Sequence, residues 1–163
     1  MHDPGYLLAE ALGNRLNALN LYLALAESCT GGGIAKAITD VPGSSGWFDR
    51  GFVTYSNDAK IDMLGVKPET LARVGAVSEE TALEMVAGTL THSLANLALS
   101  VTGIAGPDGG TPVKPVGTVF IAWQKRGASG ACLKKQFSGD RQSIRQQATL
   151  FCLQQLLHML ENA

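Results

Sequence analysis

A short polar stretch after an apolar run holds the residues best suited to chemistry. Residues 21–26 are apolar and of strand length, Ser28 and Cys29 carry a hydroxyl and a thiol, and glycines fill positions 31–33. This order predicts a strand, a tight turn and a helix. We expect the free N–H groups of that helix to point at a ligand, because glycine lets a ligand approach the backbone. The alternative is that Ser28 or Thr30 only caps the helix.

Nucleophilic catalysis by Ser28 or Cys29 needs a base, and Lys60 is the best placed candidate. Lys60 follows a second expected strand end, and a lysine can accept a hydroxyl proton when burial lowers its pKa towards neutrality. The alternative for Lys60 is a solvated lysine on a helix. The alternative for Cys29 is a small buried thiol beside a strand.

Other common chemistries lack their residues. The histidines at positions 2, 92 and 158 lie away from the polar stretches, which argues against a metal site and against a Ser-His-Asp arrangement. The chain contains no Walker A sequence, and the glycines at 103, 106 and 109 do not have the spacing of a dinucleotide-binding fingerprint. The three cysteines form no CxxC pair. We therefore expect no metal and no cofactor.

Composition is typical of one compact domain spanning residues 1–163. Apolar residues make up 45% of the chain and charged residues 17%, and 13 basic against 14 acidic residues give a net charge of −1. Without a stripe of Lys or Arg, nucleic-acid binding lacks its usual electrostatic footprint. The N-terminus has no leader pattern and no apolar run is long enough for a bilayer, so we expect a cytoplasmic protein that binds no membrane.

Alternating helix and strand patterns predict an α/β fold. We expect a three-layer α/β/α sandwich whose mixed, largely parallel sheet carries an antiparallel hairpin at one edge. Strands are predicted at 21–26, 52–55, 97–102, 117–123 and 131–137. Polar or glycine-rich stretches follow Ala26, Tyr55 and Thr102. Because ligands bind beyond the carboxyl ends of such strands, these stretches should converge on one crevice.

Six motifs together resemble the CinA C-terminal domain family, in order and in spacing, along nearly the whole chain. They are AESCTGG at 26–32, GFVTYSN at 51–57 with Lys60, GAVS at 75–78, TGIAGPDGG at 102–110, KPVGT at 114–118 and FSGDR at 137–141. The resemblance implies hydrolysis of the carboxamide of nicotinamide mononucleotide to nicotinate mononucleotide and ammonia. The substrate would be a small-molecule nucleotide.

The same resemblance assigns roles to residues. Members are described as Ser/Lys amidohydrolases, which implies that Ser28 is the nucleophile and Lys60 the base. Backbone N–H groups at residues 29–31 or around Gly103 would hold the oxyanion. The other motif residues would shape the pocket: Thr30, Gly31, Gly32, Tyr55, Asn57, Thr102, Gly103, Gly106 and Arg141.

Two departures from the family and two alternatives accompany this prediction. The chain has no room for the additional N-terminal domain of many members, so the activity of that domain should be absent, and Gly33 stands where a larger residue is expected. The alternatives are a non-catalytic nucleotide-binding or regulatory module linked to competence or damage response, and catalysis by Cys29.

We also expect a homo-oligomer, since Trp47 and Phe48 beside a glycine-rich loop suggest a subunit contact, although buried packing explains them equally well.

Overall fold

A mixed five-stranded sheet forms the centre of the computed structural model, which describes residues 2–161. The strand order is β2-β1-β3-β4-β5. Strand β1 pairs in parallel with β2 and with β3, whereas the β3–β4 and β4–β5 pairs are antiparallel. The strands are β1 (Leu23–Glu27), β2 (Phe48–Val53), β3 (Leu97–Gly103), β4 (Thr118–Lys125) and β5 (Ala131–Gln136).

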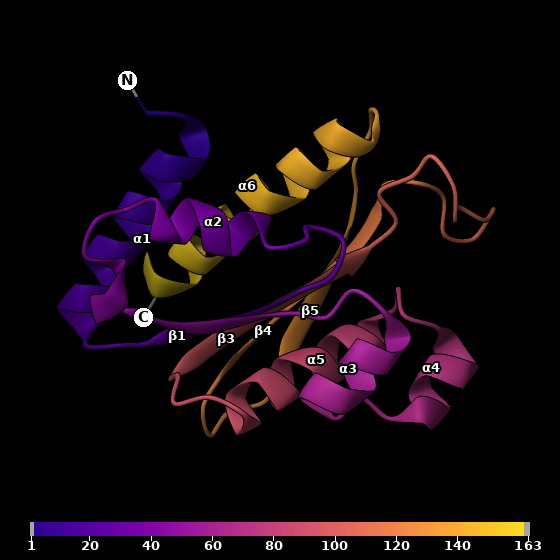
Figure 1. The fold of residues 1–163 in the computed structure, drawn as a ribbon, viewed down its shortest axis with the longest axis horizontal. Helices are drawn as coiled ribbons and strands as arrows, with labels where there is room; N and C mark the ends of the chain where they lie inside the picture. Colours follow the sequence, from indigo (N-terminus) through magenta and orange to yellow (C-terminus); the bar gives the residue numbers. More distant parts are fainter. Residues whose placement is uncertain (1, 162–163) are drawn as a thin grey trace.

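Helices cover both faces of the sheet and complete the three predicted layers (Figure 1). One face is covered by α1 (Pro4–Leu19), α2 (Gly33–Thr39) and α6 (Arg141–Glu161). The other face is covered by α3 (Asn57–Leu64), α4 (Pro68–Val74) and α5 (Glu79–Thr91), and a single 3₁₀ turn, η1 (Ser44–Gly46), precedes β2. None of the helices within residues 2–161 has the length and hydrophobicity needed to cross a membrane.

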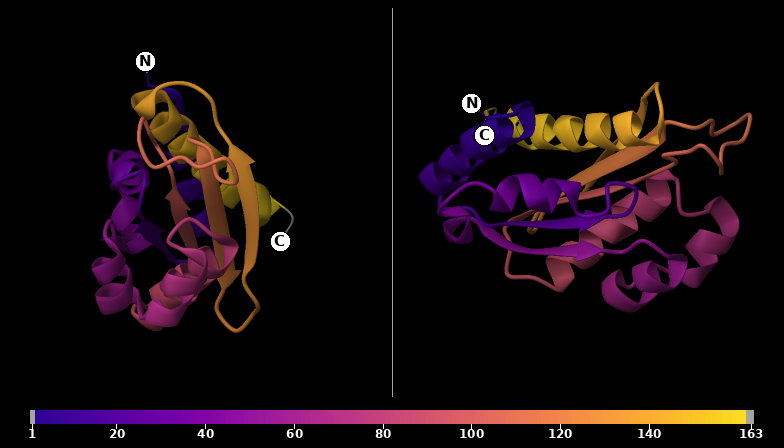
Figure 2. Two further views of the ribbon diagram at one scale, coloured as in Figure 1. Left: turned by 90° about the vertical axis from the view of Figure 1, so that its right-hand side faces the viewer. Right: turned by 45° about the horizontal axis from the view of Figure 1, so that its top comes forward.

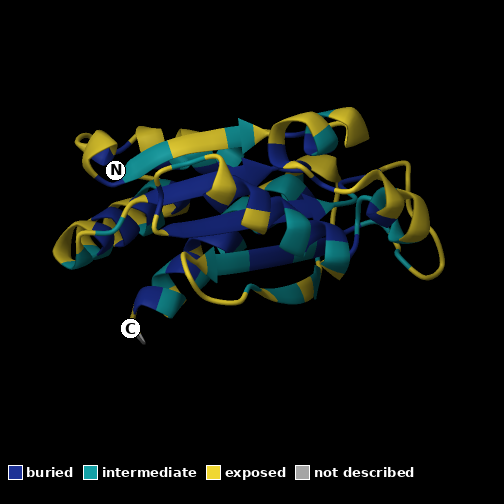
Figure 3. Ribbon diagram, turned by 90° about the horizontal axis from the view of Figure 1, so that it is seen from below, coloured by how far each residue is buried: buried dark blue, intermediate teal, exposed yellow. Residues whose placement is uncertain are grey.

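The central strands are buried because side chains on both of their faces pack against helices (Figure 3). All residues of β1 are buried, and its Leu23 and Leu25 belong to the core under α1 and α6. On the opposite face, Ala24 and Ala98 pack against α5, where their small side chains let the helix lie close to the sheet. The near-continuous apolar sequence of β1 is therefore the signature of a strand buried on both sides.

The structure confirms the predicted fold class and corrects two local predictions. Strand β2 is Phe48–Val53 and not 52–55, because its charged and glycine residues lie at a half-exposed sheet edge that lacks the expected apolar pattern. Trp47 is only 2% exposed, so the subunit contact suggested for it is replaced by core packing. The long glycine- and proline-rich loop between β3 and β4 projects beyond the sheet (Figure 2).

Candidate active site

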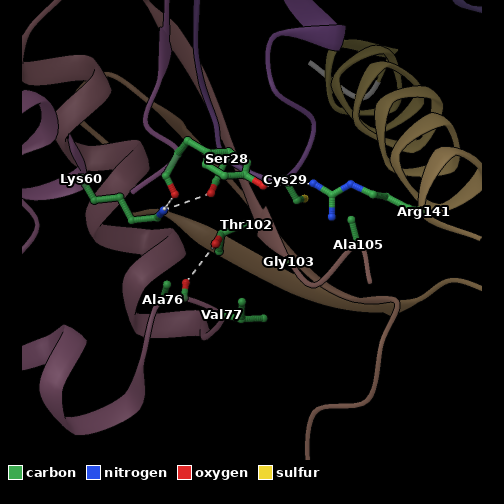
Figure 4. Close-up of a pocket in the computed structure, with 10 residues that line it drawn as sticks. Ser28, Cys29, Lys60, Ala76, Val77, Thr102, Gly103, Ala105 and Arg141 are labelled. Carbon is green, nitrogen blue, oxygen red and sulfur yellow. Dashed lines mark hydrogen bonds between the residues drawn. The ribbon is translucent and has the colours of Figure 1, made fainter. Parts of the chain in front are cut away.

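The three polar stretches meet in one cavity of about 240 Å³, as predicted (Figure 4). It lies beyond the carboxyl ends of the parallel strands β1 and β3, and it also receives residues from α3, the segment before α5, and α6. The lining residues are Ser28, Cys29, Tyr55, Lys60, Ala76, Val77, Thr102, Gly103, Ala105 and Arg141.

Ser28 and Lys60 are in hydrogen-bonding contact inside this cavity. The distance from Lys60 Nζ to Ser28 Oγ is 3.0 Å, and the lysine side chain is 1% exposed. Lys60 reaches this position because Ser56 caps α3 through the Ala59 N–H, which places Lys60 in the first turn of the helix. The two residues are thus in contact, and the alternative of a solvated helix lysine is wrong, whereas their roles as nucleophile and base stay a prediction.

The surroundings of the Lys60 amine favour its neutral form. Burial lowers the pKa of Lys60 below its ordinary value of 10.5, and among residues 2–161 no carboxylate forms an ion pair with it. Its Nζ lies 2.9 Å from the carbonyl oxygen of Thr54 and 3.2 Å from that of Tyr55. A neutral amine donates its two N–H groups to these carbonyls and turns its lone pair towards Ser28 Oγ.

Cys29 lines the same cavity but is a poor candidate for the nucleophile. Burial raises the pKa of its thiol to about 12, and the nearby Glu27 carboxylate adds to this effect. The thiolate, which is the reactive form, is therefore scarce at neutral pH. The environment of the two side chains favours Ser28 over Cys29.

The N-terminus of α2 is already occupied by a carboxylate from the protein. Glu27, at the end of β1, accepts hydrogen bonds from the N–H groups of Ile34 at 2.9 Å and Ala35 at 2.9 Å, and from Thr30 Oγ1 at 2.6 Å. The expectation that free N–H groups of this helix point at a ligand is therefore wrong. Thr30 likewise turns its hydroxyl to Glu27 and lies outside the cavity.

A guanidinium group from α6 holds the outer side of the same turn. Arg145 donates from Nε to the Cys29 carbonyl at 3.1 Å and from Nη2 to the Thr30 carbonyl at 3.3 Å. Gly31, at φ +60°, passes so close that an added Cβ would lie 2.9 Å from Arg145 Nη2. Arg145 was not predicted as a site residue, because nothing in the order of the residues shows that α6 returns to this turn.

Arg141 and Tyr55 form the rim of the cavity. Arg141 donates from Nη1 to the Gly106 carbonyl at 2.7 Å and from Nη2 to the Tyr55 hydroxyl at 3.0 Å. Tyr55 is 61% exposed, so this contact lies at the entrance. Figure 4 shows the guanidinium of Arg141 directed from α6 towards Ser28 and Cys29. The entrance thus carries a positive charge.

The structure brings together some of the predicted site residues and leaves others outside the lining. Ser28, Lys60, Tyr55, Thr102, Gly103 and Arg141 line the cavity, whereas Thr30, Gly31, Gly32, Asn57 and Gly106 do not. Ala76, Val77 and Ala105 also line it and were not assigned, although the first two lie in the motif at 75–78 and the third in the motif at 102–110. The Thr102 hydroxyl donates to the Ala76 carbonyl at 3.0 Å, which ties that motif to β3.

The sequence of nearly the whole chain matches one protein family. The chain belongs to the CinA C-terminal domain family, whose sequence model matches residues 6–160. Within residues 2–161 no group of three or more His, Cys, Asp or Glu side chains is placed to hold a metal ion. Gly33 stands at a position where a larger residue was expected. A Cβ atom added to it would lie 3.0 Å from Thr149 Oγ1, so the glycine leaves room for the Thr149 side chain.

Named relatives cover almost the whole chain. The Escherichia coli K12 protein called nicotinamide-nucleotide amidohydrolase PncC is 53% identical over 149 residues, covering 91% of this chain and 90% of the relative. A protein of the same name from Pseudomonas putida is 50% identical and covers 96% and 98%. The crystal structure of competence/damage inducible protein CihA from Agrobacterium tumefaciens is 45% identical, with a TM-score of 0.94 and coverage of 99% and 98%.

Proposed function

We propose that this protein hydrolyses the carboxamide of nicotinamide mononucleotide to nicotinate mononucleotide and ammonia. The observation that carries the proposal is the 3.0 Å contact between Ser28 Oγ and a buried Lys60 amine that has no acidic partner within residues 2–161. Relatives about half identical to this chain are named for this substrate class and reaction type. The proposal assigns the activity to one domain spanning residues 1–163, with no cofactor.

Ser28 acts as the nucleophile and Lys60 as the general base and acid. The Ser28 oxygen attacks the carboxamide carbon while Lys60 takes the hydroxyl proton, and the tetrahedral intermediate expels ammonia after Lys60 returns that proton to the leaving nitrogen. Water then attacks the acyl-serine ester, with Lys60 again removing a proton and returning it to Ser28 Oγ. The sum is amide plus water giving acid plus ammonia.

Backbone N–H groups of the nucleophile turn stabilise the oxyanion in this mechanism. The Gly31 N–H already donates to the Ser28 carbonyl at 3.0 Å, so it is removed from the group expected at residues 29–31. The N–H groups of Cys29 and Thr30 are the remaining donors there, and Arg145 on the Cys29 carbonyl polarises the peptide group that carries the Thr30 N–H.

The shape and charge of the cavity fit a mononucleotide entering with its ring first. Small residues, Ala76, Gly103 and Ala105, leave space for a flat ring next to Ser28, and Arg141 at the entrance pairs with the phosphate. Tyr55 offers its ring for stacking on the same side. Thr102, Asn57 and the glycines of the turns support these surfaces.

Ammonia release from nicotinamide mononucleotide tests the proposal directly. Wild type should release ammonia and form nicotinate mononucleotide in equal amounts, and Ser28→Ala should lose this turnover while still binding the nucleotide. Saturable binding by calorimetry without any ammonia from wild type would favour the alternative, a non-catalytic nucleotide-binding module. Ordinary turnover by Ser28→Ala would contradict the assigned nucleophile but not the reaction.

The proposal also covers the setting of the enzyme. We infer a cytoplasmic homo-oligomer that binds neither nucleic acid nor membrane, in keeping with the near-neutral net charge of −1. Trp47 gives no support for the oligomer, since it is buried in the core. A mass of about one chain from light scattering would contradict the oligomer.

A further inference from the structure

A buried carboxylate next to the nucleophile has no part in the mechanism above. Glu27 immediately precedes Ser28 and is 1% exposed. Its Oε1 accepts from Thr30 Oγ1 and the Ile34 N–H, and its Oε2 accepts from the Ala35 N–H. All three donors belong to the turn and the first residues of α2, and none belongs to Lys60 or to another lining residue of the cavity.

Helix α2 depends on this carboxylate for its N-terminus. Its N-cap is Gly32, in the left-handed region at φ 98°, and glycine has no side chain with which to cap the helix. Glu27, at the end of the preceding strand, supplies the missing acceptors. Its carboxylate accepts hydrogen bonds from the N–H groups of the second and third residues of the helix, Ile34 and Ala35. Strand end and helix start are thereby tied together across the turn that carries Ser28.

The backbone of Ser28 is fixed at the other side of the turn. Its N–H donates to the Val101 carbonyl of β3 at 3.0 Å, and its carbonyl accepts from the Gly31 N–H at 3.0 Å. These bonds hold the start of the turn, whereas Glu27 holds its end. Without the bonds to Glu27, the rest of the turn is held only through its Cys29 and Thr30 carbonyls, which accept from Arg145 and from the Gly33 N–H. We expect that remaining hold to let Ser28 Oγ move relative to Lys60 Nζ.

We propose that Glu27 is a positioning residue, whose bonds to Thr30 and α2 hold Ser28 Oγ at reaction distance from Lys60 and orient the oxyanion donors of the turn. The inference rests on the proposed function for its reaction, but it concerns the reactivity of Ser28 itself. Displacement of a reacting group by about 1 Å costs about a hundredfold in rate, so a small movement of the turn is measurable.

The chain contains a matched control for Glu27. Glu84 on α5 also accepts from a backbone N–H, that of Lys67 at 2.9 Å, and from a threonine hydroxyl, Thr70 Oγ1 at 2.6 Å. It ties α4 to α5 and lines no part of the candidate active site. Glu27→Gln and Glu84→Gln therefore make the same chemical change, one beside the nucleophile and one away from it, although Glu27 is buried with three donors and Glu84 is half-buried with two.

The experiment measures the reactivity of Ser28 with and without the substrate. A serine-directed sulfonyl fluoride, which forms a bond to Ser28 Oγ with loss of fluoride, reports the rate of labelling by intact mass, with Ser28→Ala as the blank. The kcat and KM for nicotinamide mononucleotide are measured alongside. The variants are Glu27→Gln, Thr30→Val, Thr30→Ser, Glu84→Gln and Thr70→Val, each compared by its thermal unfolding.

Glu27→Gln should lower both the labelling rate and kcat by about tenfold or more, with KM changed by less than about threefold. The glutamine amide places an N–H donor against the Ala35 N–H, which is the physical cause of the loss. Thr30→Val should give a smaller loss of the same kind, and Thr30→Ser should restore most of it. Glu84→Gln and Thr70→Val should change both rates by less than about twofold.

Equal losses in Glu27→Gln and Glu84→Gln would overturn the proposal, since they would reflect general stability. An unchanged labelling rate in Glu27→Gln would also overturn the proposal. If Glu27→Gln does not fold, an unchanged labelling rate in Thr30→Val would overturn it instead. If wild type is labelled at Ser28 but releases no ammonia, the proposed reaction fails while the labelling rates still decide the role of Glu27. Absence of labelling in wild type would remove the reactive serine and with it the role of Glu27.

Discussion

Replacement of Lys60 by methionine tests the centre of the mechanism. Methionine keeps the length and the apolar stem of the side chain but has neither the lone pair nor the N–H groups that contact Ser28, Thr54 and Tyr55. Lys60→Arg is the second variant, because arginine keeps a positive charge and does not release its proton in the working range. Lys36→Arg, at an exposed lysine paired with Asp40, is the control.

The size of the effect follows from the role of a general base. A positioned base contributes about 10²–10⁴-fold, or roughly 3–5 kcal/mol of barrier, so both Lys60 variants should lose at least about a hundredfold in kcat/KM. Binding of nicotinate mononucleotide should change much less, because the proposed mechanism places Lys60 beside the reacting carbon, whereas the phosphate is assigned to Arg141 at the entrance. Lys36→Arg should match wild type.

The pH dependence gives the sign of the effect. In the proposed mechanism neutral Lys60 is the active form, so kcat/KM should rise with pH through the pKa of Lys60 in the free enzyme, which burial places below 10.5. The other ionisable groups that line the cavity are Cys29, Tyr55 and Arg141. The pKa of Cys29 is about 12, so its titration would come later than that of Lys60.

The assay is ammonia release over a pH series for wild type and both variants. The rising limb should be present in wild type and absent from whatever activity remains in Lys60→Met. If kcat/KM of Lys60→Met falls by only about threefold and still rises with pH as in wild type, Lys60 is not the general base and only positions the substrate.

Four further outcomes follow from the structure. Cys29→Ala should keep kcat to within about threefold, since the pKa of this thiol is raised to about 12, and kinetic assay checks it. Folding lowers the pKa of Lys60, so the unfolded chain of the wild type binds more protons than the folded protein between the two pKa values. The free energy of unfolding of wild type, compared with that of Lys60→Met, should therefore rise as the pH rises towards 10.5. Denaturant titration over a pH series measures this difference. Gly88→Ala should lower the free energy of unfolding by about 1–3 kcal/mol, because its Cβ would overlap the Leu64 carbonyl. Arg141→Met should raise KM by about tenfold or more and change kcat less.

The sequence alone predicted the elements and their order well, because β1 and β3 are mostly apolar and several helices begin at recognisable caps. Ser56 and Ser78, residue types that favour helix N-termini, cap α3 and α5. The edge strand β2 was misplaced because an edge exposes part of its residues to water and so loses the apolar signal. Pairing across the sheet is set by packing, which the order of residues does not contain.

The burial of Lys60 could not be predicted from the pattern of α3. The hydrophobic pattern favours the apolar residues Ile61, Met63 and Leu64 as its inner contacts. Met63, however, is 40% exposed, and the buried residues are Lys60 and Leu64. These two lie four residues apart, on one face of the helix. A charged residue on the inner face contradicts the hydrophobic pattern, and such contradictions are where functional residues are found.

Glu27 is the other residue whose role the pattern concealed. A glutamate at the end of an otherwise apolar buried strand carries a signal, because a buried carboxylate needs partners. The partners, however, are backbone N–H groups of α2, and their identity depends on how the turn folds back. No role was therefore predicted for Glu27 from the sequence, and its hydrogen-bond partners became known only from the geometry of the turn.

The end of β2 explains why a lysine fits beside Ser28 without an acidic partner. The Thr54 N–H still donates to the Glu27 carbonyl at 2.9 Å, after which the chain leaves the sheet. The carbonyls of Thr54 and Tyr55 then accept from Lys60 in place of a neighbouring strand. Because a buried carbonyl without a donor costs about 1–3 kcal/mol, the fold itself holds the amine in place. These two carbonyls hold the amine next to Ser28 without an acidic partner, and burial lowers the pKa of Lys60 below its ordinary value of 10.5.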